Sequence, residues 1–535
     1  DSADYFLGGR DATWLAIGAS IFASNIGSEH LIGLAGAGAS SGMAMAHWEI
    51  QGWMILILGW VFVPFYTRSM VYTMPEFLER RYNPQSRTIL SVISLVSYVL
   101  TKVAVTVYAG GLVFQQVFGI KELWGIDFFW IAAIGLVVLT ALYTIFGGMK
   151  SVLYTSVLQT PILLLGSLII LVLGFKELGG WDEMMRVCGA VTVNDYGDTM
   201  TNLIRSNDDA NFPWLGALIG SAIIGFWYWC TDQFIVQRVL SGKNEMEARR
   251  GTIFGAYLKL LPVFLFLIPG MIAFALHQKY IGAGGEGFLP MLENGTANAD
   301  AAFPTLVAKL LPAGVKGLVV CGILAALMSS LASLFNSSAM LFTIDFYKRF
   351  RPQTSEKKLV GIGQVATVVI VILGILWIPI MRSVGDVLYT YLQDVQSVLA
   401  PGIAAAFLLG ICWKRTSAQG GMWGLISGMV IGLTRLGAKV YYSNAGEVAD
   451  STFKYLFYDM NWLFFCGWMF LFCIIVVIVV SLATEAPTAE KIQGLVFGTA
   501  TKEQKASTRA SWNHWDIIHT VIILAITGAF YWYFW

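Results

Sequence analysis

The sequence predicts an all-α membrane protein that crosses the bilayer many times. Apolar residues make up 57% of its 535 residues and charged residues only 13%, whereas about a quarter of the residues in a soluble domain are charged. Apolar stretches of about 20 residues, the length that one helix needs to span a bilayer, recur throughout the chain. The 19 Trp, 21 Tyr and 34 Phe fit aromatic belts at two membrane interfaces. This composition argues against a soluble globule, a disordered chain and a nucleic-acid-binding protein.

The length rule predicts about thirteen membrane spans. They lie at roughly 13–39, 43–67, 87–118, 126–147, 151–175, 213–240, 252–277, 314–346, 360–382, 384–412, 418–442, 455–483 and 513–535. Three polar stretches, about 177–212, 280–312 and 484–512, are long enough to form ordered loops. The first two contain short amphipathic segments, and the third is expected to tether the last helix.

Lys and Arg gather in alternate loops, and this alternation predicts the orientation. One set of loops contains Arg80, Arg81, Arg249 and Arg250, whereas the loop between the third and fourth spans contains only Lys121. Loops rich in Lys and Arg face the cytoplasm. We therefore expect a multi-pass protein of the plasma membrane, or of a bacterial inner membrane. Residue 1 would be cytoplasmic and the C-terminus extracellular or periplasmic.

Two of the predicted spans are interrupted by polar residues and glycine. The first reads ASNIGSEH at 23–30, and the sixth reads CTDQ at 230–233. Irregular backbone is tolerated at membrane depth only where protein or a water-filled cavity surrounds it. Interrupted helices at corresponding positions of two halves indicate a transporter with inverted repeats.

The spacing of the two interruptions predicts the domain organisation. The repeats would cover about 13–175 and 213–412. Together they would form a ten-helix transport core over residues 1–415, followed by accessory transmembrane helices over 416–535. The polar tether at 484–512 would lie in the cytoplasm.

Polar side chains lie within four of the spans. They are His30, Glu49, Lys259 and Gln393, and Asn25 lies in the first interruption. An ionisable group costs about 2.5–3.5 kcal/mol at such a depth, so each needs an explanation. Each could pair with a neighbour and hold two helices together. Convergence on one cavity is the favoured explanation, and the donors and acceptors would suit the hydroxyls of a sugar.

Aromatic and hydroxyl side chains near the interruptions allow two explanations each. Tyr228 and Trp229 could stack on a sugar ring or close over it, and they could equally be packing residues. Ser329 and Ser330 in the eighth span could be positions of close helix packing. They could also supply neutral oxygens to a hard cation such as sodium.

Long motifs spread over nearly the whole chain carry a family resemblance. They are ASNIGSEH at 23–30, GLAG at 33–36, TMPEF at 73–77, WYWCTDQ at 227–233, VQR at 236–238, YLKL at 257–260, MSSL at 328–331, FLL at 407–409 and WKR at 413–415. In these motifs the chain closely resembles the sodium–glucose cotransporter family. The resemblance implies the five-plus-five inverted-repeat bundle named after the leucine transporter. It also implies an extra helix before the first core span.

The resemblance assigns roles to individual positions. The sugar-binding positions of the family match Asn25, His30, Glu49, Lys259 and Gln393. The inner-gate tyrosine and its neighbouring tryptophan match Tyr228 and Trp229, and the outer hydrophobic gate falls at Trp48 and Tyr389. The sodium site matches the carbonyls of Ala23, Ile26 and Ala326 and the hydroxyls of Ser329 and Ser330.

These roles imply a sodium-coupled symporter that imports a neutral sugar, a hexose of the glucose or galactose type, by alternating access. Members of the family commonly have Asp where this chain has Ser156, so we expect one sodium ion per sugar. Glu29 departs from the glucose carriers and resembles the inositol carriers, which makes sodium/myo-inositol symport one alternative. A sodium-dependent sugar sensor or channel on the same scaffold is another. An enzyme is not expected, because the sequence shows no nucleophile–base pair.

Overall fold

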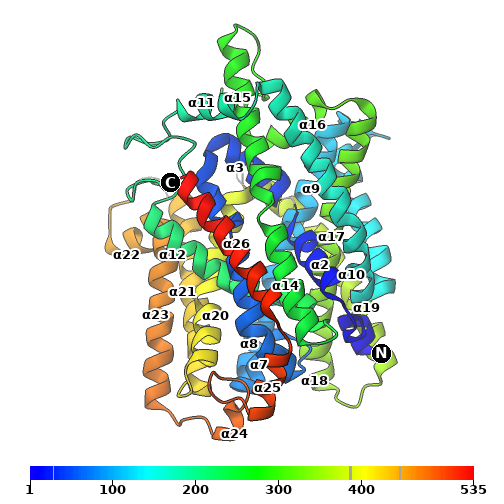
Figure 1. The fold of residues 1–535 in the computed structure, drawn as a ribbon, viewed down its shortest axis with the longest axis vertical. Coiled ribbons are helices and arrows are strands. Elements are labelled where there is room, and N and C mark those ends of the chain that lie inside the picture. The colour runs from blue at the N-terminus through cyan, green and yellow to red at the C-terminus, as the bar shows by residue number, and fades with distance from the viewer. Residues whose placement is uncertain (28, 293–294, 385–387, 445–447) are drawn as a thin grey trace.

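The computed structural model describes residues 1–27, 29–292, 295–384, 388–444 and 448–535 (Figure 1). For residues 99–101, 112, 378–384, 388–391, 394, 440, 443 and 444 it describes the backbone only. Over these ranges the protein is mostly helical. Its one described sheet is the small hairpin of β1 (Glu122–Leu123) and β2 (Ile126–Asp127).

The helices of the first half lead from the N-terminus to the first long loop. They are α1 (Ser2–Leu7), η1 (Gly8–Arg10), α2 (Trp14–Asn25), η2 (Glu29–Leu34), α3 (Ala35–Ser40), η3 (Gly42–Met45), α4 (Ala46–Glu49), α5 (Gly52–Ile57), η4 (Leu58–Phe62), α6 (Val63–Ser69), α7 (Met74–Arg81), α8 (Pro84–Ser97), η5 (Tyr98–Val103), α9 (Ala104–Phe118), α10 (Phe128–Leu178) and α11 (Trp181–Gly189).

The helices of the second half continue to the C-terminus. They are α12 (Trp214–Gly225), η6 (Phe226–Thr231), α13 (Gln233–Leu240), α14 (Glu245–Lys259), η7 (Val263–Leu267), α15 (Ile268–Gly282), η8 (Ala299–Ala301), α16 (Ala302–Leu310), α17 (Ala313–Met340), η9 (Leu341–Tyr347), α18 (Lys348–Phe350), α19 (Glu356–Val384), α20 (Leu388–Cys412), α21 (Ala418–Asn444), α22 (Thr452–Lys454), η10 (Tyr455–Asp459), α23 (Trp462–Ala483), α24 (Ala489–Ile492), α25 (Lys502–Ala510) and α26 (His514–Tyr533).

Nine helical stretches in the described ranges are long and apolar enough to cross a membrane. One of them, α10, covers both the fourth and the fifth predicted spans. The turn expected between these spans is confined to the kink at Gly148, a non-helical residue (φ 54°, ψ −148°) at which the two spans meet. A Cβ at this position would lie 2.3 Å from the carbonyl oxygen of Tyr5, so glycine lets α1 pack directly against the kink. The amphipathic segments expected in the first two loops are present as α11 and α16.

Both predicted interruptions are confirmed. Helix α2 ends at Asn25, because Ile26 adopts an extended conformation (φ −77°, ψ 110°), and the chain resumes as the π-helical turn η2. In the second half, η6 ends at Asp232 (φ −76°, ψ 130°). The Asp232 carboxylate then accepts a hydrogen bond from the N–H of Phe234 and caps α13. Each break exposes backbone carbonyls and N–H groups in the middle of the bundle.

The broken helices lie at the centre of the bundle. Helix α2 packs against α10 and α14, and α10 runs alongside α17. Glycine makes the closest of these contacts possible, since a Cβ at Gly18 would lie 2.4 Å from the Phe254 ring and one at Gly251 would lie 2.5 Å from Ile17. Helices α20, α21 and α23 form a group at one flank, and α26 crosses the surface beside α14 (Figure 1).

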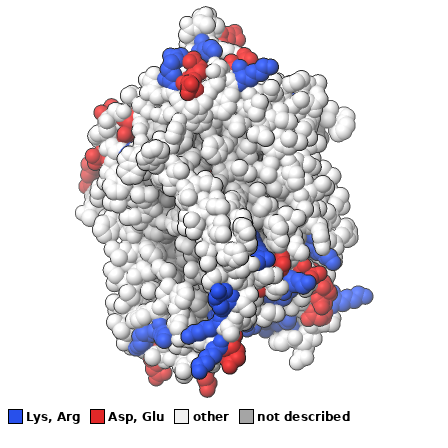
Figure 2. All heavy atoms as spheres, in the orientation of Figure 1, with Lys and Arg blue, Asp and Glu red and all other residues white. Residues whose placement is uncertain are grey.

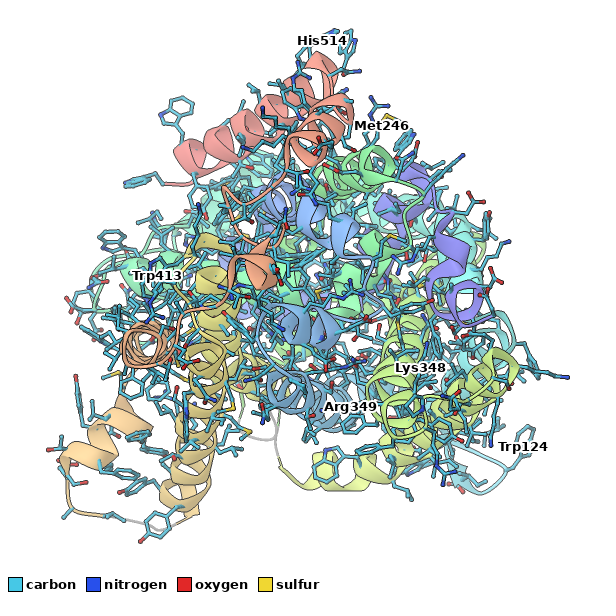
Figure 3. All side chains as sticks on the ribbon, turned by 90° about the horizontal axis from the view of Figure 1, so that it is seen from below. Trp124, Met246, Lys348, Arg349, Trp413 and His514 are labelled. Atoms are coloured by element: carbon cyan, nitrogen blue, oxygen red, sulfur yellow. The ribbon has the colours of Figure 1, made fainter. Side chains whose placement is uncertain are left out.

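The surface is largely uncharged between two charged ends (Figure 2). Lys and Arg gather at the lower end, which also holds the N-terminus, α18 and α25, whereas the C-terminus lies nearer the opposite end (Figure 1). Met246, Lys348, Arg349 and Trp413 are spread over this lower end in the view from below (Figure 3). The predicted tether before α26 folds as α24 and α25 and is held by a hydrogen bond of 2.6 Å from Arg68 to Thr508.

Candidate substrate and sodium sites

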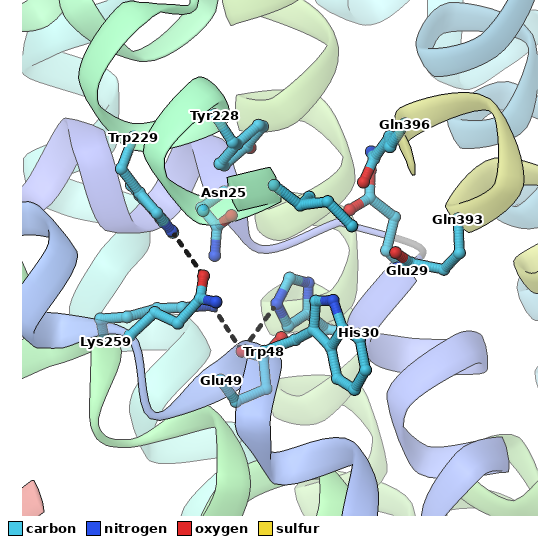
Figure 4. Close-up of a pocket in the computed structure, with 13 residues that line it drawn as sticks. Asn25, Glu29, His30, Trp48, Glu49, Tyr228, Trp229, Lys259, Gln393 and Gln396 are labelled. Carbon is cyan, nitrogen blue, oxygen red and sulfur yellow. Dashed lines mark hydrogen bonds and ion pairs between the residues drawn. The ribbon is translucent and has the colours of Figure 1, made fainter. Parts of the chain in front are cut away.

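A small cavity of about 50 Å³ lies between the two broken helices (Figure 4). It is lined by Asn25, Glu29, His30, Trp48, Glu49, Gln51, Ile224, Gly225, Tyr228, Trp229, Lys259, Gln393 and Gln396. All seven residues predicted to bind substrate are in this group, together with the predicted gate residue Trp48. The structure therefore brings polar residues of separate predicted spans together around one cavity.

Glu49 is the centre of the polar wall of the cavity. Its Oε2 accepts a hydrogen bond of 2.6 Å from Lys259 Nζ and lies 3.2 Å from His30 Nε2. The side chains of Glu49, Lys259 and His30 are 9%, 4% and 4% exposed. The N–H of Gly27 points to His30 Nδ1 at 3.5 Å, which favours the tautomer that donates from Nε2 to Glu49. The carboxylate and the ammonium group thus balance each other.

Gln51 links α5 to the second broken helix. Its Nε2 donates to the carbonyl of Ser221 at 2.8 Å, and its Oε1 accepts from Trp229 Nε1 at 3.3 Å. Gly225 makes room for this side chain, because a Cβ there would lie 2.7 Å from Gln51 Oε1. The indole ring of Trp229 also faces Lys259 Nζ, 5.2 Å from the ring centroid. The link fixes the Trp229 ring against the polar wall.

Three buried polar atoms at the cavity have no hydrogen-bond partner among the described residues. They are Asn25 Nδ2, Gln393 Oε1 and Trp48 Nε1. A buried polar group without a partner costs about 1–3 kcal/mol. A ligand that carries hydroxyl groups would relieve this cost, since a hydroxyl both donates and accepts.

The predicted outer gate is only partly described. Trp48 stacks on Trp462 of α23 with ring centroids 5.5 Å apart and meets the edge of Phe212 from the first long loop at 5.9 Å. The neighbouring His47 contacts the Tyr531 hydroxyl at 2.9 Å and the Leu203 carbonyl at 3.0 Å. The other predicted gate residue, Tyr389, lies outside the described side chains.

The predicted sodium ligands lie where α2 ends against α17. The hydroxyl of Ser330 would be 3.1 Å from a Cβ at Gly27, directly after the break, and Ser329 Oγ lies 3.4 Å from Ser156 Oγ of α10. Ala23 is in the last turn of α2, whose final carbonyls have no partner within a helix. Such a set of neutral oxygens suits a hard monovalent cation. Ala326 lies one turn before these two serines on α17.

The structure adds three polar cavity residues that the sequence had not singled out as ligands. They are Glu29, Gln51 and Gln396. A usable signal existed for two of them. Gln51 lies two residues after Glu49, and Gln396 is three residues after Gln393 on the same face of α20.

Comparisons with known proteins agree on one family. The model of the sodium:solute symporter family matches residues 5–428. The human sodium/myo-inositol cotransporter 2 is 37% identical over 508 residues, which are 92% of this chain and 74% of that protein. The dog sodium/myo-inositol cotransporter is 37% identical over 516 residues, 92% of this chain and 71% of that protein.

Solved structures share the fold. A Na⁺-coupled sialic acid symporter in a substrate-bound outward-open state has a TM-score of 0.72 at 22% identity, covering 91% of this chain and 93% of that one. Mhp1, a nucleobase-cation-symport-1 family transporter in a closed conformation with bromovinylhydantoin bound, has a TM-score of 0.50 at 12% identity, covering 95% and 99%. The expected inverted-repeat fold of the leucine-transporter type is thus confirmed. This chain is a sodium-coupled solute transporter and belongs to the sodium:solute symporter family.

Proposed function

We propose that this chain imports a neutral cyclic polyol together with sodium, and that myo-inositol is a better substrate than a hexose of the glucose type. Two relatives with 37% identity over 92% of the chain are sodium/myo-inositol cotransporters. This favours the inositol alternative over the hexose that the family resemblance alone suggested. The two substrates share a six-membered ring and a set of hydroxyl groups, so the same residue types serve both.

The cavity chemistry supports a neutral substrate. Lys259 and Glu49 neutralise each other at 2.6 Å, so among the described lining residues no Lys or Arg is left unpaired for a carboxylate substrate. Glu29 adds a carboxylate to the cavity lining, and this would repel an anion further. The unpaired amide atoms of Asn25 and Gln393 instead offer a donor and an acceptor to hydroxyl groups. These unpaired atoms are the observation that carries the proposal.

The cavity has to expand to hold a six-membered ring. Its volume is about 50 Å³, whereas a buried cavity that binds benzene measures about 150 Å³. The aromatic side chains at its borders would move to enlarge it. Trp48, stacked on Trp462, lies on one side, and Tyr228 lies on the other. Movement of the two sides in turn would give alternating access.

Sodium would act through the junction of α2 and α17. Carbonyls of Ala23, Ile26 and Ala326 with the hydroxyls of Ser329 and Ser330 would hold the ion and tie the two helices together, which favours the outward-open state. Separation of α2 from α17 in the inward-open state would weaken the site and release the ion. Since Ser156 provides no fixed charge, one ion per substrate is proposed.

The proposed orientation places the basic end of the molecule in the cytoplasm. Figure 2 shows Lys and Arg concentrated at the end that holds the N-terminus. One inward positive charge per cycle would then gain about 2.3 kcal/mol per 100 mV of membrane potential. Residues 13–175 and 213–412 would be the two repeats of the transport core.

A competition experiment tests the proposed substrate. The purified chain in proteoliposomes with an inward sodium gradient takes up labelled myo-inositol, and unlabelled myo-inositol, glucose, galactose and sialic acid are added in turn. We expect myo-inositol to compete at the lowest concentration and sialic acid not to compete. Stronger competition by glucose or galactose would return the assignment to a hexose.

A further inference from the structure

A second buried ion pair lies behind Tyr228, outside the lining of the cavity. Lys102 of η5 donates from Nζ to Asp232 Oδ2 at 2.8 Å, and the two side chains are 4% and 2% exposed. Asp232 is also the residue at which the second broken helix is interrupted. The pair therefore joins the third predicted span to the break itself.

Four aromatic rings surround the Lys102 ammonium group. Its Nζ lies 4.6 Å from the ring centroid of Tyr228, and the other three distances are 4.8 Å to Phe234, 5.0 Å to Tyr98 and 5.5 Å to Trp227. All are within the range of a cation–π interaction. Tyr98 makes a further link, because its hydroxyl accepts a hydrogen bond of 3.1 Å from the N–H of Phe234. One ammonium group thus holds Tyr228 and the start of α13 against η5.

This cluster lies between the cavity and the basic end of the molecule. Helix α13 begins at the cluster and ends at Leu240, whose carbonyl accepts a hydrogen bond from Arg10. The Ser241 carbonyl also accepts a hydrogen bond, from the N–H of Ala12. Helix α13 therefore ends beside the N-terminal segment at the lower end in Figure 1. Trp48, on the other side of the cavity from Tyr228, contacts Phe212 instead. Phe212 belongs to the first long loop, in the part that follows α11.

We propose that Lys102 is a positioning residue for transport. Its contacts with Asp232 and Tyr228 hold closed the side of the cavity that faces the basic end, and they separate whenever substrate leaves on that side. A buried ion pair is poorly suited to general stabilisation, because desolvation offsets most of the attraction, but it can fix one arrangement of two helices. The inference concerns the transport cycle and holds for any polyol or other solute.

Hydrogen exchange of the full chain in lipid nanodiscs and sodium buffer tests the proposal. The variant Lys102→Met with Asp232→Asn removes both charges, leaves no uncompensated buried ion and keeps an Ncap residue for α13. We expect the amides of 232–240 to exchange about tenfold faster, whereas those of α23 stay unchanged. The sodium concentration for half-maximal uptake should rise several-fold, because the inner-closed state that binds sodium from outside is less populated.

Two further variants make the result specific. Lys102→Arg, with Asp232 left unchanged, keeps the charge. It should show the slow exchange and the sodium dependence of the original chain. Arg250→Met removes another ion pair between helices, Arg250 with Asp516 at 3.1 Å, and should leave exchange at 232–240 unchanged. Unchanged exchange at 232–240 in the double variant would overturn the proposal. An equal increase in α23 would overturn it as well, because the pair would then stabilise the whole bundle.

Discussion

Lys259 Nζ lies 2.6 Å from Glu49 Oε2, so an ammonium group on α14 and a carboxylate on α4 neutralise each other at the cavity wall. The pair brings together residues 210 positions apart in the chain. The pair makes the cavity wall polar and adds no net charge of its own, which fits the proposed neutral polyol.

Replacement of Lys259 by Ala should abolish most uptake. It leaves the buried Glu49 without its counter-ion, and breaking a buried pair in this way costs about 3–5 kcal/mol. We expect myo-inositol uptake to fall more than tenfold and the thermal unfolding temperature to drop. Lys279→Ala is the matched control, since Lys279 donates to the Leu178 carbonyl at 3.0 Å outside the cavity. Uptake in Lys259→Ala equal to that control would contradict the assignment.

Gln393 should affect substrate affinity and leave stability unchanged. Its Oε1 is buried with no partner among the described residues, so no protein contact through that atom is lost when the side chain is changed. One lost hydrogen bond of about 1.4 kcal/mol corresponds to a KM about tenfold higher in Gln393→Ala. Gln393→Glu should also weaken uptake, because it adds a charge beside Glu29. Transport kinetics with Gln364→Ala as the control check this, and an unchanged KM would exclude Gln393 as a ligand.

Ser330→Ala should raise the sodium concentration needed for half-maximal uptake. The variant removes one of the oxygens beside the break at Gly27 and leaves α17 helical. Ser338→Ala, two turns further along the same helix and also buried, should leave sodium dependence unchanged. Sodium titrations of uptake measure both. The ion-site assignment is wrong if Ser330→Ala behaves like Ser338→Ala.

The ratio of sodium to substrate should be one. Ser156 donates to the Val152 carbonyl at 2.6 Å and contacts Ser329, so its hydroxyl belongs to the helix junction and adds no charge for a second ion. Charge movement and labelled substrate uptake recorded in the same cells give the ratio directly. A value near two would require a second cation site.

The folded conformation of the first long loop, about 177–212, should persist in mild acid. Burial opposes ionisation of Asp209, but hydrogen bonds from the N–H groups of Phe212 and Asn211 and from Asn194 outweigh it and lower the pKa of the carboxyl. The pKa is lower in the folded protein than in the unfolded chain. Its contribution to stability is therefore full above about pH 4, the usual value for Asp, and is lost as the pH falls through the lowered pKa.

Protease resistance of this loop measures the effect. We expect it to persist from pH 7 to about pH 4 and to decrease at pH 7 in Asp209→Asn, which also loosens the loop at Phe212, where it contacts Trp48. Loss of resistance already near pH 6 would show that another group controls the loop.

The sequence predicts the breaks well, because polar residues at 23–30 and 230–233 cannot face lipid. It also singles out polar side chains that line the cavity, since each stands out in an apolar span. It misses Glu29, Gln51 and Gln396 as lining residues. It does not predict that the turn between the fourth and fifth spans needs only one non-helical residue, Gly148. Nor does it pair Lys102 with Asp232 or Gln51 with Trp229, because those contacts depend on how spans far apart in the chain are aligned.

The residue types in the sequence also do not decide whether the substrate is a hexose or inositol. Asn25, Glu49, Lys259 and Gln393 offer donors and acceptors that both rings can use, so residue types alone did not decide between them. The similarity to two sodium/myo-inositol cotransporters over 92% of the chain moved the proposal to inositol. Glu29, which lines the cavity beside His30, is the sequence feature that agrees with this shift.

Net accumulation of labelled myo-inositol by sealed proteoliposomes tests the central claim most directly. With an inward sodium gradient, the internal concentration should rise above the external one, and replacement of sodium by choline should prevent this. Equilibration without accumulation, or equal uptake in choline, would contradict sodium-coupled symport of a neutral polyol.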